Sequence, residues 1–241
     1  MCGRITATFE FSDIRVRWNL DRDLPLYSPR YNIAPEQIAS ASGQKIPVIV
    51  RDQNGNHCRL MHWGLIPYWA KDPTIENRMI NARAETLTEL PSFKPLVDRR
   101  RCIIPADGFY EWRKQGRRKV PMWVHLRNLQ PFGLAGLWDV WRKPDGKRLE
   151  SFTIITTEPN ELVRPIHNRM PGSCAQKMKS NGLTFLAHLT KAKSLLKSYP
   201  QELMDAHDVS TIVNSAKYDG PECIRPVSED EIPRAGQLSL L

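Results

Sequence analysis

The 241-residue sequence has no apolar run close to the roughly 20 residues that a transmembrane helix requires. The first thirty residues also lack the uninterrupted apolar segment of a secretory signal peptide, because charged residues such as Arg4, Asp13 and Arg15 interrupt them. These two absences argue against export and against a membrane partner. The sequence therefore predicts a cytoplasmic protein.

Cysteine is scarce, with five residues, and none of them lies in a CxxC pair or a Cys/His cluster with the spacing of zinc ligands. We therefore expect no metal site, and nothing in the sequence calls for a cofactor. The odd number and wide separation of the cysteines fit free thiols in a reducing compartment better than a disulfide framework.

Positive charge is abundant, at a formal net charge of +9. Such an excess fits a nucleic-acid partner, although it is also common in basic proteins that bind nothing acidic. Two clusters, at residues 99–101 and 113–119, concentrate the charge. Either could be the solvated end of a hairpin. That interpretation is favoured for the second cluster, where Gln115-Gly116 is typical of a turn.

The apolar fraction of 41% allows a sizeable core, and seven tryptophans with nineteen prolines suggest a compact α+β protein rich in loops. Asn54-Gly55 between two apolar segments predicts a β-hairpin. Helices are expected at residues 11–18 and 183–197, the second from leucines on one helical face, with a short helix beginning at 200–204. Further strands are expected at residues 46–50, 59–64, 101–105, 109–112, 120–124, 132–138 and 151–157.

Cys2 follows the initiator methionine, which an aminopeptidase removes readily when the next side chain is small. The mature chain would then begin with an α-amine, of pKa roughly 7.7–8.0, beside a thiol on the same residue. This 1,2-aminothiol condenses with an aldehyde to a Schiff base, which the sulfur closes to a thiazolidine. The alternative is an ordinary cysteine in a frayed terminus.

Three polar residues in apolar or turn-forming surroundings are further candidates, namely Asn81, Glu111 and His167. Each has an ordinary alternative: a turn cap for Asn81, an arginine partner for Glu111 and a structural histidine at 167. Their surroundings belong to seven motifs that occur in order along the chain: Cys2-Gly3-Arg4, Arg30-Tyr31-Asn32-Ile33-Ala34-Pro35, Trp63-Gly64-Leu65-Ile66-Pro67, Ile80-Asn81-Ala82-Arg83-Ala84-Glu85-Thr86, Phe93-Lys94-Pro95, Asp107-Gly108-Phe109-Tyr110-Glu111-Trp112 and His167-Asn168-Arg169-Met170-Pro171.

Together the seven motifs resemble the SOS-response-associated peptidase (SRAP) family of abasic-site processing proteins, from Cys2 to about Val227. The resemblance implies an α+β fold: a single SRAP domain, residues 2–230, with a twisted barrel-like β core and peripheral helices. It also implies that a monomer binds single-stranded DNA at an abasic site and joins Cys2 to the opened deoxyribose as a thiazolidine. Autopeptidase activity and weak β-elimination of the lyase type would accompany this reaction, in a nucleoid-associated bacterial protein.

Site roles follow from the same resemblance. Cys2 would supply both nucleophiles, Asn81 would hold the new terminus, and Glu111 would be the general acid–base. His167 would shuttle protons, for which an unperturbed pKa near 6.5 is suitable. The implied DNA contacts are the phosphate clamps Arg4, Arg83 and Arg169, with Asn32, Pro35, Trp69 and Thr156 shaping the pocket.

Two segments depart from the family or extend beyond it. Residues 172–182 are small and polar where the family continues as an apolar strand, so the sequence suggests a loop that weakens the support behind His167. Residues 231–241 are expected to form a flexible tail, which resembles the bacterial sliding-clamp-binding peptide except for its last residue. The tentative clamp contacts are Gln237, Leu238, Leu240 and Leu241.

Two other functions remain open from the residues alone. One is an N-terminal-nucleophile amidohydrolase that uses the Cys2 thiolate on amide bonds, although such enzymes usually carry a propeptide before the nucleophile. The other is a non-enzymatic module that binds single-stranded DNA and tethers to the clamp. Neither predicts a covalent bond to DNA.

Overall fold

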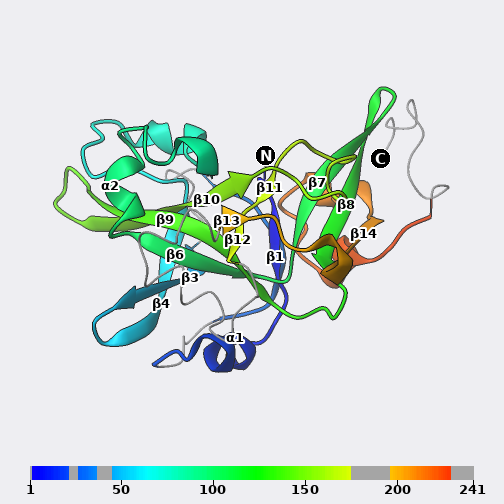
Figure 1. Cartoon of the computed structure of the whole chain (residues 1–241), viewed down its shortest axis with the longest axis horizontal. Helices are drawn as coiled ribbons and strands as arrows, with labels where there is room; N and C mark the ends of the chain where they lie inside the picture. The colour runs from blue at the N-terminus through cyan, green and yellow to red at the C-terminus, as the bar shows by residue number, and fades with distance from the viewer. Residues whose placement is uncertain (1, 22–26, 37–44, 175–195, 229–241) are drawn as a thin grey trace.

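The computed structural model describes residues 2–21, 27–36, 45–174 and 196–228, and its elements are drawn in Figure 1. Two sheets make up most of this part of the chain. In Figure 1 one sheet lies on the left, around β3, β6 and β9, and the other lies on the right, where the β7–β8 hairpin projects away from the rest.

The first sheet closes into a five-stranded barrel. Its strands are β3 (Lys45–Asp52), β4 (Gly55–Trp63), β6 (Arg101–Ala106), β9 (Phe132–Arg142) and β10 (Arg148–Thr157). Four neighbouring pairs are antiparallel, and the parallel pairing of β10 with β4 completes the ring. Closure removes the open edges of the five strands. The expected α+β fold with a barrel-like core is confirmed.

The barrel is filled by side chains that are almost completely buried. Apolar residues from all five strands share one face of the sheet and are fully buried, among them Val48, Met61, Ile104, Leu134 and Ile154. Burying such a side chain contributes about 1.5–3 kcal/mol relative to leaving it in water. The tight packing makes the barrel a rigid support for the segments attached to its rim.

The second sheet is antiparallel throughout, in the order β14, β8, β7, β1, β2. Its strands are β1 (Ile5–Ala7), β2 (Arg30–Ile33), β7 (Gly108–Gln115), β8 (Arg118–Leu126) and β14 (Met204–Asp208). The short first strand pairs with the long β7, with Ile5 opposite Phe109. The N-terminus of the chain is therefore part of a sheet.

Short strands extend the first sheet beyond the barrel. The three-residue β5 (Asn81–Arg83) runs parallel to β10, and β11 (Met170–Pro171) pairs with the end of β10. The helices are short: α1 (Phe11–Trp18), α2 (Lys94–Val97), η1 (Pro73–Arg78), η2 (Ala84–Thr86), η3 (Gln201–Leu203), η4 (Thr211–Asn214) and η5 (Pro221–Ile224). No helix in the described ranges is long and apolar enough to cross a bilayer.

Most of the elements expected from the sequence are present. The helix at residues 11–18 is α1, which starts with a capping box between Glu10 and Asp13 and ends at Asn19 with a left-handed φ of 48°. It buries Phe11, Ile14 and Trp18, which share one helical face. The hairpin around Asn54-Gly55 and all the other expected strands are confirmed.

Two expectations are wrong where the structure describes them. Leu196–Lys197, the end of the helix expected at 183–197, is strand β13, and residues 183–195 lie outside the described ranges. Ser173–Cys174, at the start of the expected loop 172–182, is strand β12, which pairs with β13 and β9. The helix begun at 200–204 is one turn, η3, before β14. Backbone pairing to neighbours, which local composition does not report, fixes both strands.

Candidate functional site

Residues 2–4, which precede β1, lie along β7. The amide of Tyr110 donates to the carbonyl oxygen of Arg4 at 3.0 Å, which extends the β1–β7 pairing toward Cys2. Cys2 has no exposed surface. The alternative of a cysteine in a frayed terminus is therefore wrong.

Asn81 holds this segment from the other sheet. Its side-chain amide Nδ2 donates to the carbonyl oxygen of Cys2 at 2.7 Å. Asn81 begins β5, where it lies opposite Ile154 of the barrel strand β10. The hydrogen bond therefore fixes the backbone of Cys2 relative to the barrel.

Glu111 belongs to β7, lies close to Cys2 and is 3% exposed. Burial raises the pKa of the Glu111 carboxyl, while the N-terminal amine and His167 act in the opposite direction. Burial also raises the pKa of the Cys2 thiol, and the charge of Glu111 raises it further. Burial therefore favours the protonated form of both the Cys2 thiol and the Glu111 carboxyl.

His167 faces Glu111 from the turn that precedes β11. Its Nδ1 atom lies 4.0 Å from Glu111 Oε1, and the imidazole is half-buried. The backbone amide of His167 donates to the carbonyl oxygen of Val163 at 2.9 Å, which holds the turn. At this distance the imidazole is beyond direct hydrogen-bonding reach and acts on the Glu111 carboxyl through its charge.

Glu111 and His167 lie in the wall of a cleft of about 760 Å³, which two lysines and an arginine also line. Lys114 and Lys119 lie opposite each other in the β7–β8 hairpin, and exposed Arg164 comes from the turn that carries His167. The other lining residues are Trp112, Pro165, Ile166, Asn168 and Asn214.

Two like charges directly opposite each other on a hairpin are destabilising. The pair of Lys114 and Lys119 therefore does not stabilise the hairpin and adds positive charge to the wall of the cleft. The sequence favoured a solvated hairpin end for the cluster at 113–119, and the cluster does lie at the exposed end of the β7–β8 hairpin, where two of its members also line the cleft.

The other basic cluster belongs to the barrel. The guanidinium of Arg100 lies 4.2 Å from the centre of the Trp138 ring. Arg101 is buried at the start of β6 and donates to the carbonyl oxygen of Val97 at 2.5 Å. These two arginines pack against the fold, so the interpretation as a solvated hairpin end is wrong for them.

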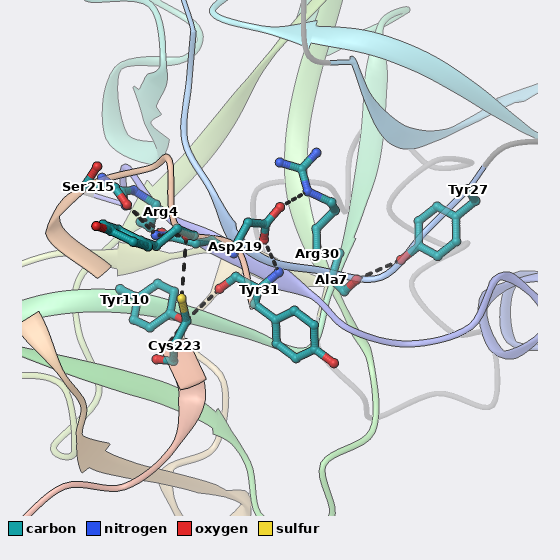
Figure 2. A network of polar contacts seen from close by, with 11 residues as sticks. Arg4, Ala7, Tyr27, Arg30, Tyr31, Tyr110, Ser215, Asp219 and Cys223 are labelled. Atoms are coloured by element: carbon teal, nitrogen blue, oxygen red, sulfur yellow. Dashed lines mark hydrogen bonds and ion pairs between the residues drawn. The ribbon is translucent and has the colours of Figure 1, made fainter. Parts of the chain in front are cut away.

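Arg4 and Asn32 are tied into a polar network under the site, shown in part in Figure 2. Arg4 donates to Asn32 Oδ1 and to the carbonyl oxygen of Val213, both at 2.5 Å, and lies 5.8 Å from the ring of Trp112. Asn32 is buried and donates to the carbonyl oxygens of Ser215 and Tyr218. Both side chains therefore already hold the segment at 213–218.

Asp219 anchors the same segment to β2 (Figure 2). Its carboxylate accepts from the amides of Tyr31 at 2.6 Å and Asn32 at 2.8 Å, and from the side chain of Arg30. The hydroxyl of Tyr110 donates to the carbonyl oxygen of Tyr31 at 2.7 Å. The C-terminal part of the domain thereby supports the strand that lies beside the N-terminus.

The remaining predicted DNA contacts differ in accessibility. Arg83 is exposed on β5, and Trp69 is 47% exposed beside a second hollow of about 610 Å³ that Lys71 and Arg78 also line. Pro35 is half-buried just after β2. Thr156 and Arg169 contact each other below the surface, where Arg169 Nη2 donates to the carbonyl oxygen of Thr156 at 2.6 Å.

The predicted clamp contacts Gln237, Leu238, Leu240 and Leu241 lie outside the described residues. Four cysteines are free thiols, namely Cys2, Cys58, Cys102 and Cys223. In the part of the chain that the structure describes, no group of three His, Cys, Asp or Glu side chains could hold a metal ion.

The sequence analysis assigned no site role to Trp112 or Arg164, and it named Lys114 and Lys119 only as members of the basic cluster at 113–119. Trp112 could have been found from its position next to Glu111 in the aromatic strand. The lysines could have been found by pairing β7 with β8 about the Gln115-Gly116 turn, which places positions 114 and 119 opposite each other.

Comparison with known proteins gives a consistent result. Residues 1–216 match the sequence model of the family described as SOS response associated peptidase (SRAP). The abasic site processing protein YoqW of Bacillus subtilis is 46% identical, over 93% of this chain and 99% of its own. The abasic site processing protein HMCES of Gallus gallus is 32% identical, over 83% of this chain and 67% of its own. A crystal structure of a protein from Bacteroides thetaiotaomicron superposes with a TM-score of 0.81 at 26% identity, over 94% and 100% of the two chains.

Proposed function

The chain belongs to the SRAP family, and from this premise we propose that it processes abasic sites by bonding covalently to them. The substrate is single-stranded DNA in which a base has been lost and the deoxyribose has opened to an aldehyde. The product is a thiazolidine between the aldehyde carbon and the mature N-terminal Cys2. The observation that carries the proposal is the position of Cys2, which Asn81 holds at 2.7 Å beside the buried Glu111.

The reaction begins with removal of Met1, which turns the amide nitrogen of Cys2 into an amine. The amine adds to the aldehyde carbon, and loss of one water molecule gives a Schiff base. The sulfur then adds to the same carbon while the thiol proton passes to the nitrogen. No oxidant, metal or further reactant is needed, and the DNA strand stays intact.

Glu111 and His167 supply the proton transfers. The carbinolamine loses water only if its hydroxyl is protonated, and burial, which raises the pKa of the Glu111 carboxyl, favours the protonated form that can give this proton. The thiol must then lose its proton to attack, and the Glu111 carboxylate left by the first transfer accepts it, with His167 Nδ1 4.0 Å from its Oε1. The buried thiol stays protonated until this step, because burial raises its pKa.

The DNA backbone would follow the basic cleft. Lys114, Lys119 and Arg164 line it beyond the reacting groups, so phosphates on one side of the lesion would meet three cations. Arg164 is partly engaged by Glu161 at 2.9 Å, an exposed pair that a phosphate could replace at little cost. Exposed Trp69 would stack on a base, and recognition would depend on backbone and shape with little sequence preference.

The proposal also covers the finer expectations. Slow reversal of the adduct and loss of the residue before Cys2 would account for peptidase activity, and β-elimination from the Schiff base for weak lyase activity. The protein would act as a cytoplasmic monomer near the nucleoid, with residues 2–230 as one domain. The tail at 231–241 would bind the sliding clamp, and its deletion should abolish clamp binding in a pull-down while leaving crosslinking intact.

A denaturing gel tests the proposal. Purified protein is mixed with a single-stranded oligonucleotide from which a uracil has been excised, and a band of protein joined to DNA should survive boiling. Cys2→Ala should abolish the band. Cys58→Ala, which removes a free thiol from β4, should leave it unchanged.

An undiminished band with Cys2→Ala, or retention of Met1 in the mass spectrum of an active preparation, would overturn the proposal. The amidohydrolase and the non-covalent binding module both predict no band with the unmodified protein. The gel therefore separates the proposed function from both alternatives.

A further inference from the structure

Glu85 and Arg169 form a two-pronged ion pair behind His167. Arg169 Nη1 donates to Glu85 Oε1 at 2.8 Å, and Nη2 donates to Oε2 at 3.0 Å. Nη2 also donates to the carbonyl oxygen of Thr156 at 2.6 Å. This fork geometry fixes the plane of a guanidinium more firmly than a single contact does. The Arg169 side chain is only 14% exposed, whereas that of Glu85 is 50% exposed.

Arg169 also contacts the imidazole of His167 through its own backbone amide. The amide of Arg169 donates to His167 Nδ1 at 3.0 Å. An N–H group can donate only to a nitrogen that carries no proton, so this contact places the imidazole proton of neutral His167 on Nε2. The carbonyl oxygen of Arg169 lies farther from the same nitrogen, at 3.3 Å, and the shorter contact decides the tautomer.

Position 169 is thus held from two sides. Met170 pairs with Thr157 at the end of β10, and this pairing fixes the backbone directly after Arg169. The ion pair to Glu85, in η2 directly after β5, fixes its side chain. Loss of the carboxylate would leave the guanidinium with Thr156 as its anchor and would free the amide to turn away from His167.

We propose that Glu85 is a positioning residue for His167, which it orients through Arg169 so that Nδ1 accepts a hydrogen bond and Nε2 carries the proton. Glu85 does not touch the reacting atoms. Its effect on rate rests on the proposed function, whereas its effect on the imidazole does not. A phosphate clamp at Arg169 would require the opposite behaviour, because DNA would have to displace Glu85 from both Nη atoms.

The test combines ¹⁵N NMR of labelled histidine with crosslinking rates, for the full chain and for Glu85→Ala, Glu85→Gln and Arg169→Lys. In the unmodified protein at pH 8, the chemical shifts should report His167 protonated on Nε2. Glu85→Ala should give a mixture of tautomers and roughly tenfold slower crosslinking, a part of the factor that general acid–base catalysis supplies. Glu85→Gln, which keeps an acceptor oxygen, should recover part of both signals.

Asp205→Ala is the matched control, because it removes the carboxylate of an exposed pair with Arg127 at 3.3 Å. It should leave the tautomer and the rate unchanged. Arg169→Lys keeps the charge and the backbone amide but loses the fork, so it should resemble Glu85→Ala even if that variant folds poorly.

An unchanged tautomer in both Glu85→Ala and Arg169→Lys would overturn the inference. If undamaged single-stranded DNA also bound more tightly to Glu85→Ala, the carboxylate would instead be a competitor of phosphate. A shifted tautomer in a protein that never forms a crosslink would support the role of Glu85 and refute the proposed function, so the two failures are distinguishable.

Discussion

Replacement of Glu111 by glutamine should abolish most of the activity and stabilise the protein at the same time. The substitution keeps the shape of a side chain that is 3% exposed, and it removes both the charge and the exchangeable proton. General acid–base catalysis contributes roughly 10²–10⁴-fold to a rate, so crosslinking should slow at least about 100-fold. Glutamine also removes the cost of a buried negative charge.

The stability change should depend on pH. Burial raises the pKa of Glu111 in the folded protein above its value in the unfolded chain, about 4.3. The neutral side chain therefore contributes its full stability below pH 4.3, and this contribution is lost as the pH rises through the folded-state pKa. Relative to glutamine, the unmodified protein should be equally stable at pH 4 and less stable at pH 8.

The expected size is modest, because the N-terminal amine and His167 partly offset the charge. A net cost of about 1 kcal/mol is at the lower end of that for a polar group buried without full compensation. For a chain of this length, this corresponds to a Tm that is about 2–4 °C higher for Glu111→Gln at pH 8. Thermal unfolding between pH 4 and pH 8.5 measures it.

The exposed Glu158→Gln is the control, and it should show no such pH-dependent gain. A Tm difference for Glu111→Gln that is the same at both ends of the pH range would refute the argument from burial. Crosslinking at the full rate would refute the assignment of Glu111 as the acid–base, whatever the Tm.

Three further predictions concern the cleft, the exposed tryptophan and a surface histidine. Lys114→Ala and Lys119→Ala should each weaken binding to undamaged single-stranded DNA, as measured by fluorescence anisotropy. Each should also lower the slope of log Kd against log salt concentration by about 0.7, and an unchanged slope would exclude a phosphate contact. Trp69→Ala should weaken the same binding by about 1–3 kcal/mol, with Trp69→Phe close to the unmodified protein, and equal losses in both would argue against stacking. The pKa of His57 is raised, chiefly by its hydrogen bond to Asp52, so its ionic contribution is present below about pH 6.5 and is lost as the pH rises through the folded-state value. His57→Ala should therefore lower the Tm more at pH 6 than at pH 8.5, and the reverse order would show that the ion pair is not stabilising.

Local signals made much of the fold predictable, but closure of the barrel depends on contacts that they do not contain. The Asn54-Gly55 turn fixes the pairing of β3 with β4, and the capping box and buried face fix α1. The parallel pairing of β10 with β4 joins segments about 90 residues apart. The strand at Ser173–Cys174 escaped prediction for the same reason, because β9 and β13 provide its hydrogen bonds.

The reacting groups could be predicted from the sequence because the family resemblance assigned roles to Cys2, Asn81, Glu111 and His167 together. The residues around them could not be predicted in this way. The pair of Glu85 with Arg169 spans 84 positions, and that of Arg4 with Asn32 spans 28. No local pattern shows that Arg4 is already occupied by Asn32 and a carbonyl group, or that two lysines near a turn face a cleft.

The pairing of β1 with β7 anchors Ile5, so the number of residues between Ile5 and Cys2 determines where the sulfur of Cys2 lies. The connection between them is short, so one residue added there would move the sulfur by about 3.3 Å relative to Glu111. A change of side chain in this stretch should therefore disturb the sulfur less than a change of length. An engineered chain with homocysteine or a backbone-extended residue at position 2 would add an atom between the sheet and the sulfur, so it should lose the alignment with Glu111.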